Sequence, residues 1–188
     1  GAPESVAALQ AMGKRVLVTG CGPIGQLAVL VARAAGAVSI VATDVTPFTL
    51  TKAQEVGADA THNVATEDEP LAPYAADKGT FDVLFECSGV AVALAGAVPA
   101  MRPGAIVMQL GLGGDMTLPM QAMTAKELDL RGSFRFHAEF STAVEMMKAG
   151  RLDVKPLITH SFPVDEAVAA FDMASDRSQA IKAQIAFS

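Results

Sequence analysis

The stretch Val16-Leu17-Val18-Thr19-Gly20-Cys21-Gly22-Pro23-Ile24-Gly25 decides the fold. A short apolar run comes first, three glycines follow with Gly-x-Gly-x-x-Gly spacing, and residues 26–32, which are apolar after Gln26, then predict a helix. Gly20 permits a tight turn, Gly22 lets a pyrophosphate approach the backbone, and Gly25 lets the helix pack closely on the strand. This order of strand, glycine turn and helix is typical of a dinucleotide-binding unit, although a glycine turn that serves packing alone stays the alternative.

An acidic residue, Asp44, ends the second predicted strand, 19 residues beyond Gly25. In this type of fold an acidic residue there accepts hydrogen bonds from the hydroxyl groups of the adenosine ribose. Its charge would repel a 2′-phosphate, and no Arg lies in residues 45–49 to receive one. The sequence therefore predicts NAD rather than NADP. The alternative is that Asp44 is the N-cap of the next helix.

Short apolar runs alternate with helix-length stretches from Lys14 to about Phe136. This alternation predicts an α/β fold with a doubly wound, parallel, six-stranded Rossmann sheet and a short C-terminal return segment. The predicted strands are residues 15–19, 38–43, 61–63, 81–87, 105–110 and 128–134. Helices are expected to begin near Ile24, Phe48, Glu69, Val90 and Pro119.

The pattern changes after Phe136. Apolar residues at 140, 144 and 147 predict a helix that stops at Gly150, and those at 164, 168 and 171 predict another. Residues 181–187 alternate between apolar and polar side chains, so we expect a strand of an antiparallel sheet there. We therefore divide the chain into a leader or cloning remnant (1–12), an NAD-binding Rossmann domain (13–154) and a return segment (155–188).

Composition limits the class of protein. The 188 residues are 51% hydrophobic and 18% charged, with a net charge of −6, which excludes a disordered chain and predicts no nucleic acid partner. No uncharged stretch reaches the ~20 residues of a membrane-spanning helix, so no membrane partner is expected. Two cysteines, Cys21 and Cys87, exclude a disulfide framework and fit a reducing, cytoplasmic location.

Ligands of such sheets bind beyond the carboxyl ends of the strands. There the sequence places residues 86–89, 110–114 and 132–136. The stretch from Gly111 to Gly114 offers bare backbone for a nicotinamide carboxamide, or is an ordinary loop. For Arg135 two interpretations are open: it faces a phosphate or a polar substrate, or it forms a surface ion pair.

With these motifs the chain resembles the C-terminal, cofactor-binding half of the zinc-dependent medium-chain alcohol dehydrogenases of the polyol group. The resemblance is strongest to the L-idonate 5-dehydrogenases and next to the sorbitol dehydrogenases, and rests on residues 20–25, 126–136 and 139–144. It implies hydride transfer between NAD and a secondary alcohol of a sugar acid or polyol, such as L-idonate and 5-ketogluconate.

The resemblance also implies roles for single residues. Ile24 would contact the cofactor beside the pyrophosphate, and Asp44 would bind the ribose. The predicted cofactor-binding residues are Gly20, Gly22, Pro23, Ile24, Gly25, Asp44, Leu110, Gly111, Leu112, Ser133, Phe134 and Arg135. Arg135 and Phe136 would lie on the substrate side. Two positions depart from the sorbitol dehydrogenases: Thr49 replaces an Arg, and Phe136 replaces a Tyr.

Enzymes of this family hold a catalytic zinc ion through a Cys and a His-Glu pair of a separate catalytic domain. This chain has no His-Glu pair, so we expect no metal site and no catalytic residue in it, and zinc only in a full-length enzyme. The isolated chain is predicted to be inactive. The return segment would fold back, swap with a second copy or leave an apolar patch, which favours a homo-oligomer. The alternatives are a free-standing NAD-binding regulatory module without catalysis, and a zinc-free dehydrogenase that uses His137.

Overall fold

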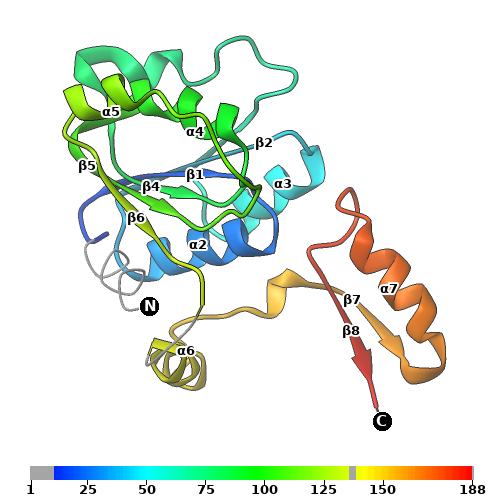
Figure 1. Ribbon diagram of the computed structural model, residues 1–188. Coiled ribbons are helices and arrows are strands. Elements are labelled where there is room, and N and C mark those ends of the chain that lie inside the picture. The colour runs from blue at the N-terminus through cyan, green and yellow to red at the C-terminus, as the bar shows by residue number, and fades with distance from the viewer. Residues whose placement is uncertain (1–10, 136–138, 188) are drawn as a thin grey trace.

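A computed structural model describes residues 11–135 and 139–187, and its main body is a six-stranded parallel sheet (Figure 1). The strand order is β3-β2-β1-β4-β5-β6, and each neighbouring pair is parallel. The strands are β1 (Arg15–Thr19), β2 (Ser39–Asp44), β3 (Ala60–Asn63), β4 (Phe81–Glu86), β5 (Met101–Gln109) and β6 (Asp129–Gly132). The order reverses between β1 and β4, where ligands of such sheets bind. The predicted doubly wound fold is confirmed.

Helices cover both faces of the sheet. On one face lie α2 (Pro23–Ala34) and α3 (Pro47–Glu55), and on the other lie α4 (Ala91–Ala97) and α5 (Met120–Ala125) (Figure 1). Successive residues of β1 point to opposite faces of the sheet. Val16 and Val18 belong to the same hydrophobic cluster as Val29 of α2, whereas Leu17 belongs to the cluster that contains Leu94 of α4. This alternation buries the strand on both faces, which is why its sequence is continuously apolar.

Two elements predicted for the main body differ from the structure. Instead of a helix that begins near Glu69, the chain forms a 3₁₀ segment, η1 (Ala72–Lys78), with positive φ angles at Asp77 and Lys78. Pro70 and Pro73 supply no backbone N–H, so they disfavour a regular helix there. The strand predicted over residues 128–134 ends at Gly132, which leaves Ser133 to Arg135 in a loop beyond it.

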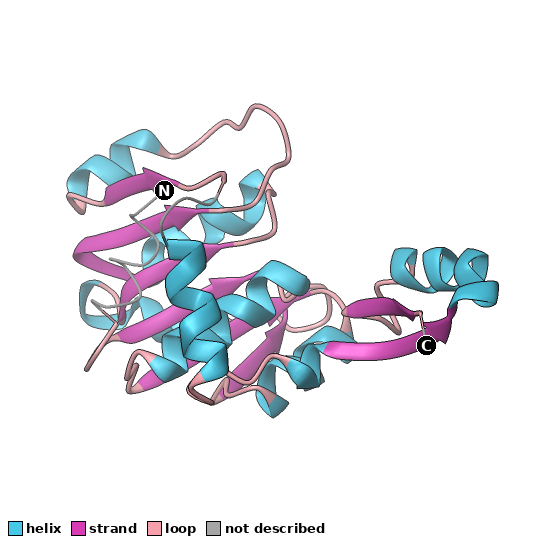
Figure 2. Ribbon diagram, turned by 90° about the horizontal axis from the view of Figure 1, so that it is seen from below, coloured by secondary structure: helices cyan, strands magenta, loops and turns pink. Residues whose placement is uncertain are grey.

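The C-terminal part leaves the main sheet and forms a small βαβ unit (Figure 2). After α6 (Glu139–Lys148) and the 3₁₀ segment η3 (Lys155–Leu157), it contains β7 (Ile158–Pro163), η4 (Val164–Glu166), α7 (Ala167–Ser175) and β8 (Lys182–Ala186). Strands β7 and β8 are parallel, so the expected antiparallel sheet was wrong. The helix between them returns the chain to the start of β7, and such a crossover joins parallel strands. The apolar and polar alternation shows only that one face is wet.

The return segment is anchored at its base. Leu157 and Ile181 are buried in the same cluster as α2 and α3, whereas Val168, Phe171 and Phe187 are more than 70% exposed. The segment therefore packs back onto the domain at one end and carries an exposed apolar surface at the other.

No helix of residues 11–135 and 139–187 is long and apolar enough to cross a membrane.

Candidate cofactor site

The glycine turn between β1 and α2 is packed so tightly that two of its positions exclude a side chain. Gly20 has a φ of +84°, and a Cβ atom on it would lie 2.7 Å from the backbone nitrogen of Ser88. A Cβ on Gly25 would lie 1.8 Å from the carbonyl oxygen of Gly20. Both glycines therefore do what the sequence predicts: one makes the turn and the other lets helix and strand meet.

Gly22, the second glycine of the turn, faces open space. A Cβ on Gly22 would have no protein atom within 4 Å. Gly22 is the N-cap of α2, no side chain caps this helix end, and its first turn holds Pro23 and no acidic residue. The free N–H groups and the helix dipole make such an end attractive to an anion. With Ile24 half exposed beside it, this region fits the pyrophosphate of a dinucleotide.

Asp44 is held at the end of β2 by backbone donors from two segments. Its Oδ2 accepts a hydrogen bond from the backbone nitrogen of Cys21 at 2.6 Å, and its Oδ1 accepts from Val45 at 2.7 Å and Thr46 at 2.9 Å. A carboxylate has about four lone-pair sites, so it can also accept from a ribose hydroxyl. Thr46 is the N-cap of α3, so the alternative role of Asp44 as that cap was wrong.

Gln26 supports the turn from behind, although no motif singled it out. It is fully buried in α2, and its Nε2 donates to the carbonyl oxygens of Cys21 at 2.9 Å and Thr49 at 2.8 Å. This amide ties the turn to α3, the helix that follows Asp44. The only signal in the sequence is a polar residue at the start of an otherwise apolar helix.

Glu86 at the end of β4 is a second residue whose role the sequence left open. Its carboxylate is fully buried and accepts hydrogen bonds from the backbone and hydroxyl of Ser88, from the backbone of Gly89, and from Nε2 of Gln109 at 2.6 Å. The hydroxyl of Thr19 is 3.4 Å away. One side chain thus joins the ends of β1, β4 and β5.

The glycines after β5 pack against the loop after β4. A Cβ on Gly111 would lie 2.1 Å from the backbone nitrogen of Gly89, and one on Gly113 would lie 1.8 Å from its carbonyl oxygen. Side chains are therefore excluded here by the neighbouring backbone. The contact of this loop with a nicotinamide carboxamide stays a prediction.

A cavity of about 590 Å³ lies at the carboxyl ends of β5 and β6. Its walls come from two stretches that the sequence places far apart: Gln109, Gly111 and Leu112 after β5, and Gly132, Ser133, Phe134 and Arg135 after β6. The Arg135 guanidinium lies 4.7 Å from the centre of the Phe134 ring, a cation–π arrangement. Arg135 forms no ion pair with another described residue, and the alternative of a surface ion pair stays open. Phe136 and His137 lie outside the described residues.

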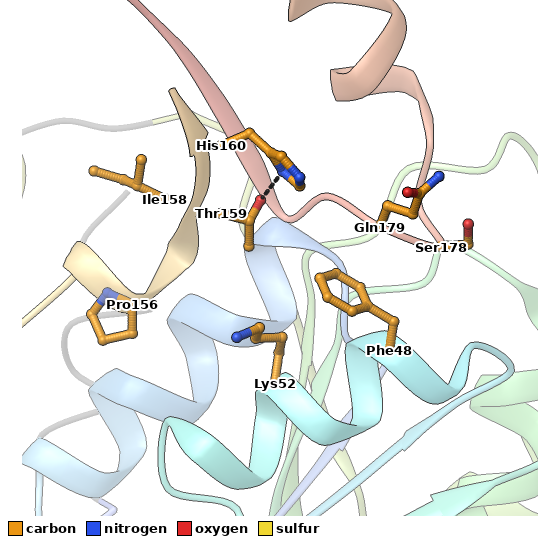
Figure 3. A pocket seen from close by; sticks show the side chains of 8 residues that line it. All are labelled: Phe48, Lys52, Pro156, Ile158, Thr159, His160, Ser178 and Gln179. Carbon is orange, nitrogen blue, oxygen red and sulfur yellow. Dashed lines mark hydrogen bonds between the residues drawn. The ribbon is translucent and has the colours of Figure 1, made fainter. Parts of the chain in front are cut away.

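A second cavity, of about 450 Å³, lies between α3 and the return segment (Figure 3). Phe48 and Lys52 point into it from α3, opposite Thr159 and His160. The Lys52 ammonium is 2.6 Å from the carboxylate of Glu55, so its charge is already paired. None of the predicted cofactor residues lines this cavity.

The donor set that zinc requires is missing from the described part of the chain. It contains no group of three His, Cys, Asp or Glu side chains that could hold a metal ion. Burial raises the pKa of the Cys21 and Cys87 thiols far above its usual value, which disfavours the thiolate that binds metals. His62 contacts Glu67 and Tyr74 instead. Zinc therefore does not fit these residues, whereas a dinucleotide fits the glycine turn and Asp44.

Comparisons with known sequences identify the family of this chain. The sequence profile of the zinc-binding dehydrogenase family matches residues 23–149. L-Idonate 5-dehydrogenase (NAD(P)(+)) of Escherichia coli K12 is 39% identical over 176 residues, which cover 93% of this chain and 51% of that protein. Human sorbitol dehydrogenase is 36% identical over 166 residues, covering 86% and 46%. The chain spans about half the length of these curated relatives.

Solved structures give the same result. The crystal structure of L-idonate 5-dehydrogenase from Escherichia coli matches 96% of this chain and 53% of its own, with a TM-score of 0.88 and 39% identity. A short chain alcohol dehydrogenase from Escherichia coli CFT073, complexed with NADH, matches 97% and 55%, with a TM-score of 0.84 and 26% identity. A putative zinc-binding dehydrogenase from Sinorhizobium meliloti, bound to NADP, matches 97% and 55%, with a TM-score of 0.81 and 25% identity. The family profile and the shared fold show that the chain belongs to the zinc-binding dehydrogenases, and it spans part of their length.

Proposed function

We propose that residues 13–154 are the NAD-binding domain, and residues 155–188 the return segment, of a dehydrogenase that interconverts a secondary alcohol of a sugar acid or polyol and its ketone. The substrate type is that of L-idonate and 5-ketogluconate. The observation that carries the proposal is the pairing of Asp44 with Cys21 beside the open Gly22. This pairing brings an anion-binding helix end and a ribose-binding carboxylate to one place.

NAD is the cofactor we propose, in preference to NADP. The carboxylate of Asp44 favours a free ribose diol and opposes a 2′-phosphate, and residues 45–49 contain no Arg to neutralise one. One relative of known structure is complexed with NADH and another is bound to NADP, so the preference for NAD is argued from the residues of this chain.

In the proposed mechanism the bound nicotinamide supplies hydride transfer, and the chain supplies orientation. The N-terminus of α2 binds the pyrophosphate, Asp44 fixes the adenosine ribose, and the backbone of Gly111 to Leu112 lines the nicotinamide. Arg135, supported by the Phe134 ring, presents a positive charge to a hydroxyl or carboxylate of the substrate. Since the described residues hold no metal site, we propose that the isolated chain does not turn over.

Cofactor titration and a turnover assay on the isolated chain test this proposal. NADH fluorescence should show binding that is tighter than that of NADPH, and 5-ketogluconate should cause no NADH oxidation. Turnover without zinc would contradict the proposal and favour a zinc-free dehydrogenase. A reading frame that continues upstream into a domain with a His-Glu pair would distinguish the dehydrogenase from a free-standing NAD-binding regulator. Light scattering tests the proposed homo-oligomer, and imaging of a tagged copy tests the proposed cytoplasmic location.

A further inference from the structure

Glu86 is a buried carboxyl group that forms no ion pair with any described residue. Its side chain is fully buried at the end of the central strand β4, and no Lys, Arg or His of the described residues forms an ion pair with it. Its partners are neutral donors: amide groups of the backbone and of Gln109, and the hydroxyl of Ser88. Such donors offset the cost of burying a carboxylate, but they leave its net charge in place.

This charge lies directly behind the cavity at β5 and β6. The Gln109 Nε2 that donates to Glu86 at 2.6 Å also donates to the carbonyl oxygen of Gly111 at 2.9 Å. Gln109 and Gly111 both line the cavity. A Cβ on Gly111 would lie 2.7 Å from Oε2 of Glu86. The Gln109 amide and the Gly111 backbone are therefore next to the carboxylate and also line the cavity.

We propose that Glu86 biases this cavity towards the oxidised cofactor, because its charge attracts the positive nicotinamide ring of NAD⁺ and not the neutral ring of NADH. The inference rests on the proposed function, which assigns the nicotinamide to this cavity. The adenosine and pyrophosphate are the same in both redox forms, so their interactions with Glu86 cancel when the two affinities are compared. Glu86 thus acts on the cofactor through its charge and without direct contact, in addition to joining three strand ends.

The test separates the charge of Glu86 from its shape. Glu86→Gln keeps the shape and removes the charge, and should weaken NAD⁺ binding relative to NADH binding by about three- to thirtyfold. Glu86→Asp keeps the charge, and should leave the ratio of the two dissociation constants unchanged even if both rise. Calorimetric titration of NAD⁺, NADH and ADP-ribose measures the effect, with ADP-ribose reporting the part of the site that lacks nicotinamide.

Each outcome has one meaning. An equal loss of NAD⁺ and NADH affinity in Glu86→Gln would show that the residue only joins loops, and would overturn the inference. If the wild-type chain binds neither redox form, the proposed function itself fails, before any variant is made. If Glu86→Gln does not fold, Ser88→Ala replaces it, because it keeps the charge and removes one donor from it. This variant should shift the ratio towards NAD⁺ by about twofold, and no shift or the opposite shift would refute the proposal.

Discussion

Replacing Asp44 by Ser tests the cofactor site most directly. Asp44 is at once the predicted ribose ligand and the acceptor for Cys21 of the glycine turn, at 2.6 Å. The serine side chain is shorter and neutral, so it cannot reach the turn and the ribose together. We expect it to remove the hydrogen bonds to the ribose diol and the repulsion of a 2′-phosphate.

The size of the effect follows from these contacts. A hydrogen bond to a charged group contributes about 1.5–3 kcal/mol, so the loss of one such bond should weaken NADH binding about ten- to a hundredfold. For NADPH the same loss is offset by relief of repulsion, on the order of 1–4 kcal/mol per charge pair at intermediate dielectric. The preference for NADH over NADPH should therefore fall by at least about fivefold.

Fluorescence titration of both cofactors on one preparation measures this preference. Asp68→Ser is the matched control, because it removes the same charge from an exposed loop position and should change neither affinity. Thermal unfolding checks that Asp44→Ser is still folded at the temperature of the titration. If NADH and NADPH lose affinity by the same factor, Asp44 does not contact the ribose and only supports the turn.

Two further predictions concern the turn and the β3 edge. Gly25→Ala should destabilise the chain by about 1–3 kcal/mol, because its Cβ would meet the carbonyl oxygen of Gly20, whereas Gly22→Ala should leave the melting temperature unchanged and weaken NADH binding. Equal melting temperatures of the two variants would contradict this difference. The hydrogen bond from His62, together with that from the Asn63 backbone, holds the pKa of Glu67 below its usual range. Ionised Glu67 therefore stabilises the fold at a pH above its unfolded-state pKa. This stabilisation is lost as the pH falls through the folded-state pKa. Glu67→Gln should therefore melt below the wild type at neutral pH, and a difference that persists in acid would refute this reasoning.

The sequence predicts the main sheet well because the central strands β1, β2 and β4 are largely buried and so leave nearly continuous apolar runs. All six strands were predicted, with ends that differ by a few residues. The helix expected near Glu69 was wrong, because the apolar spacing there competes with two prolines. The direction of β8 was wrong for another reason. Alternation reports which face of a strand is wet, and the partner strand sets the direction.

The residues predicted to face a ligand are easier to locate in the sequence than the residues that support them. Asp44 and the glycines occupy positions that the fold reserves for a dinucleotide, so spacing along the chain is enough to find them. Phe134 and Arg135 were found by their resemblance to relatives and lie on a cavity wall, but their contact with the cofactor stays a prediction.

Glu86 and Gln26 show why the supporting residues escape such reading. Glu86 approaches the Thr19 hydroxyl 67 positions away and bonds to Gln109 23 positions away, and Gln26 reaches Thr49 at a separation of 23. No local spacing encodes these pairs, because each depends on which strands the fold makes neighbours. A buried polar residue that ends an apolar strand nevertheless needs partners, since an unsatisfied carboxylate is too costly to keep. Polar residues at the carboxyl ends of central strands are therefore the positions at which the connections within such a site are found.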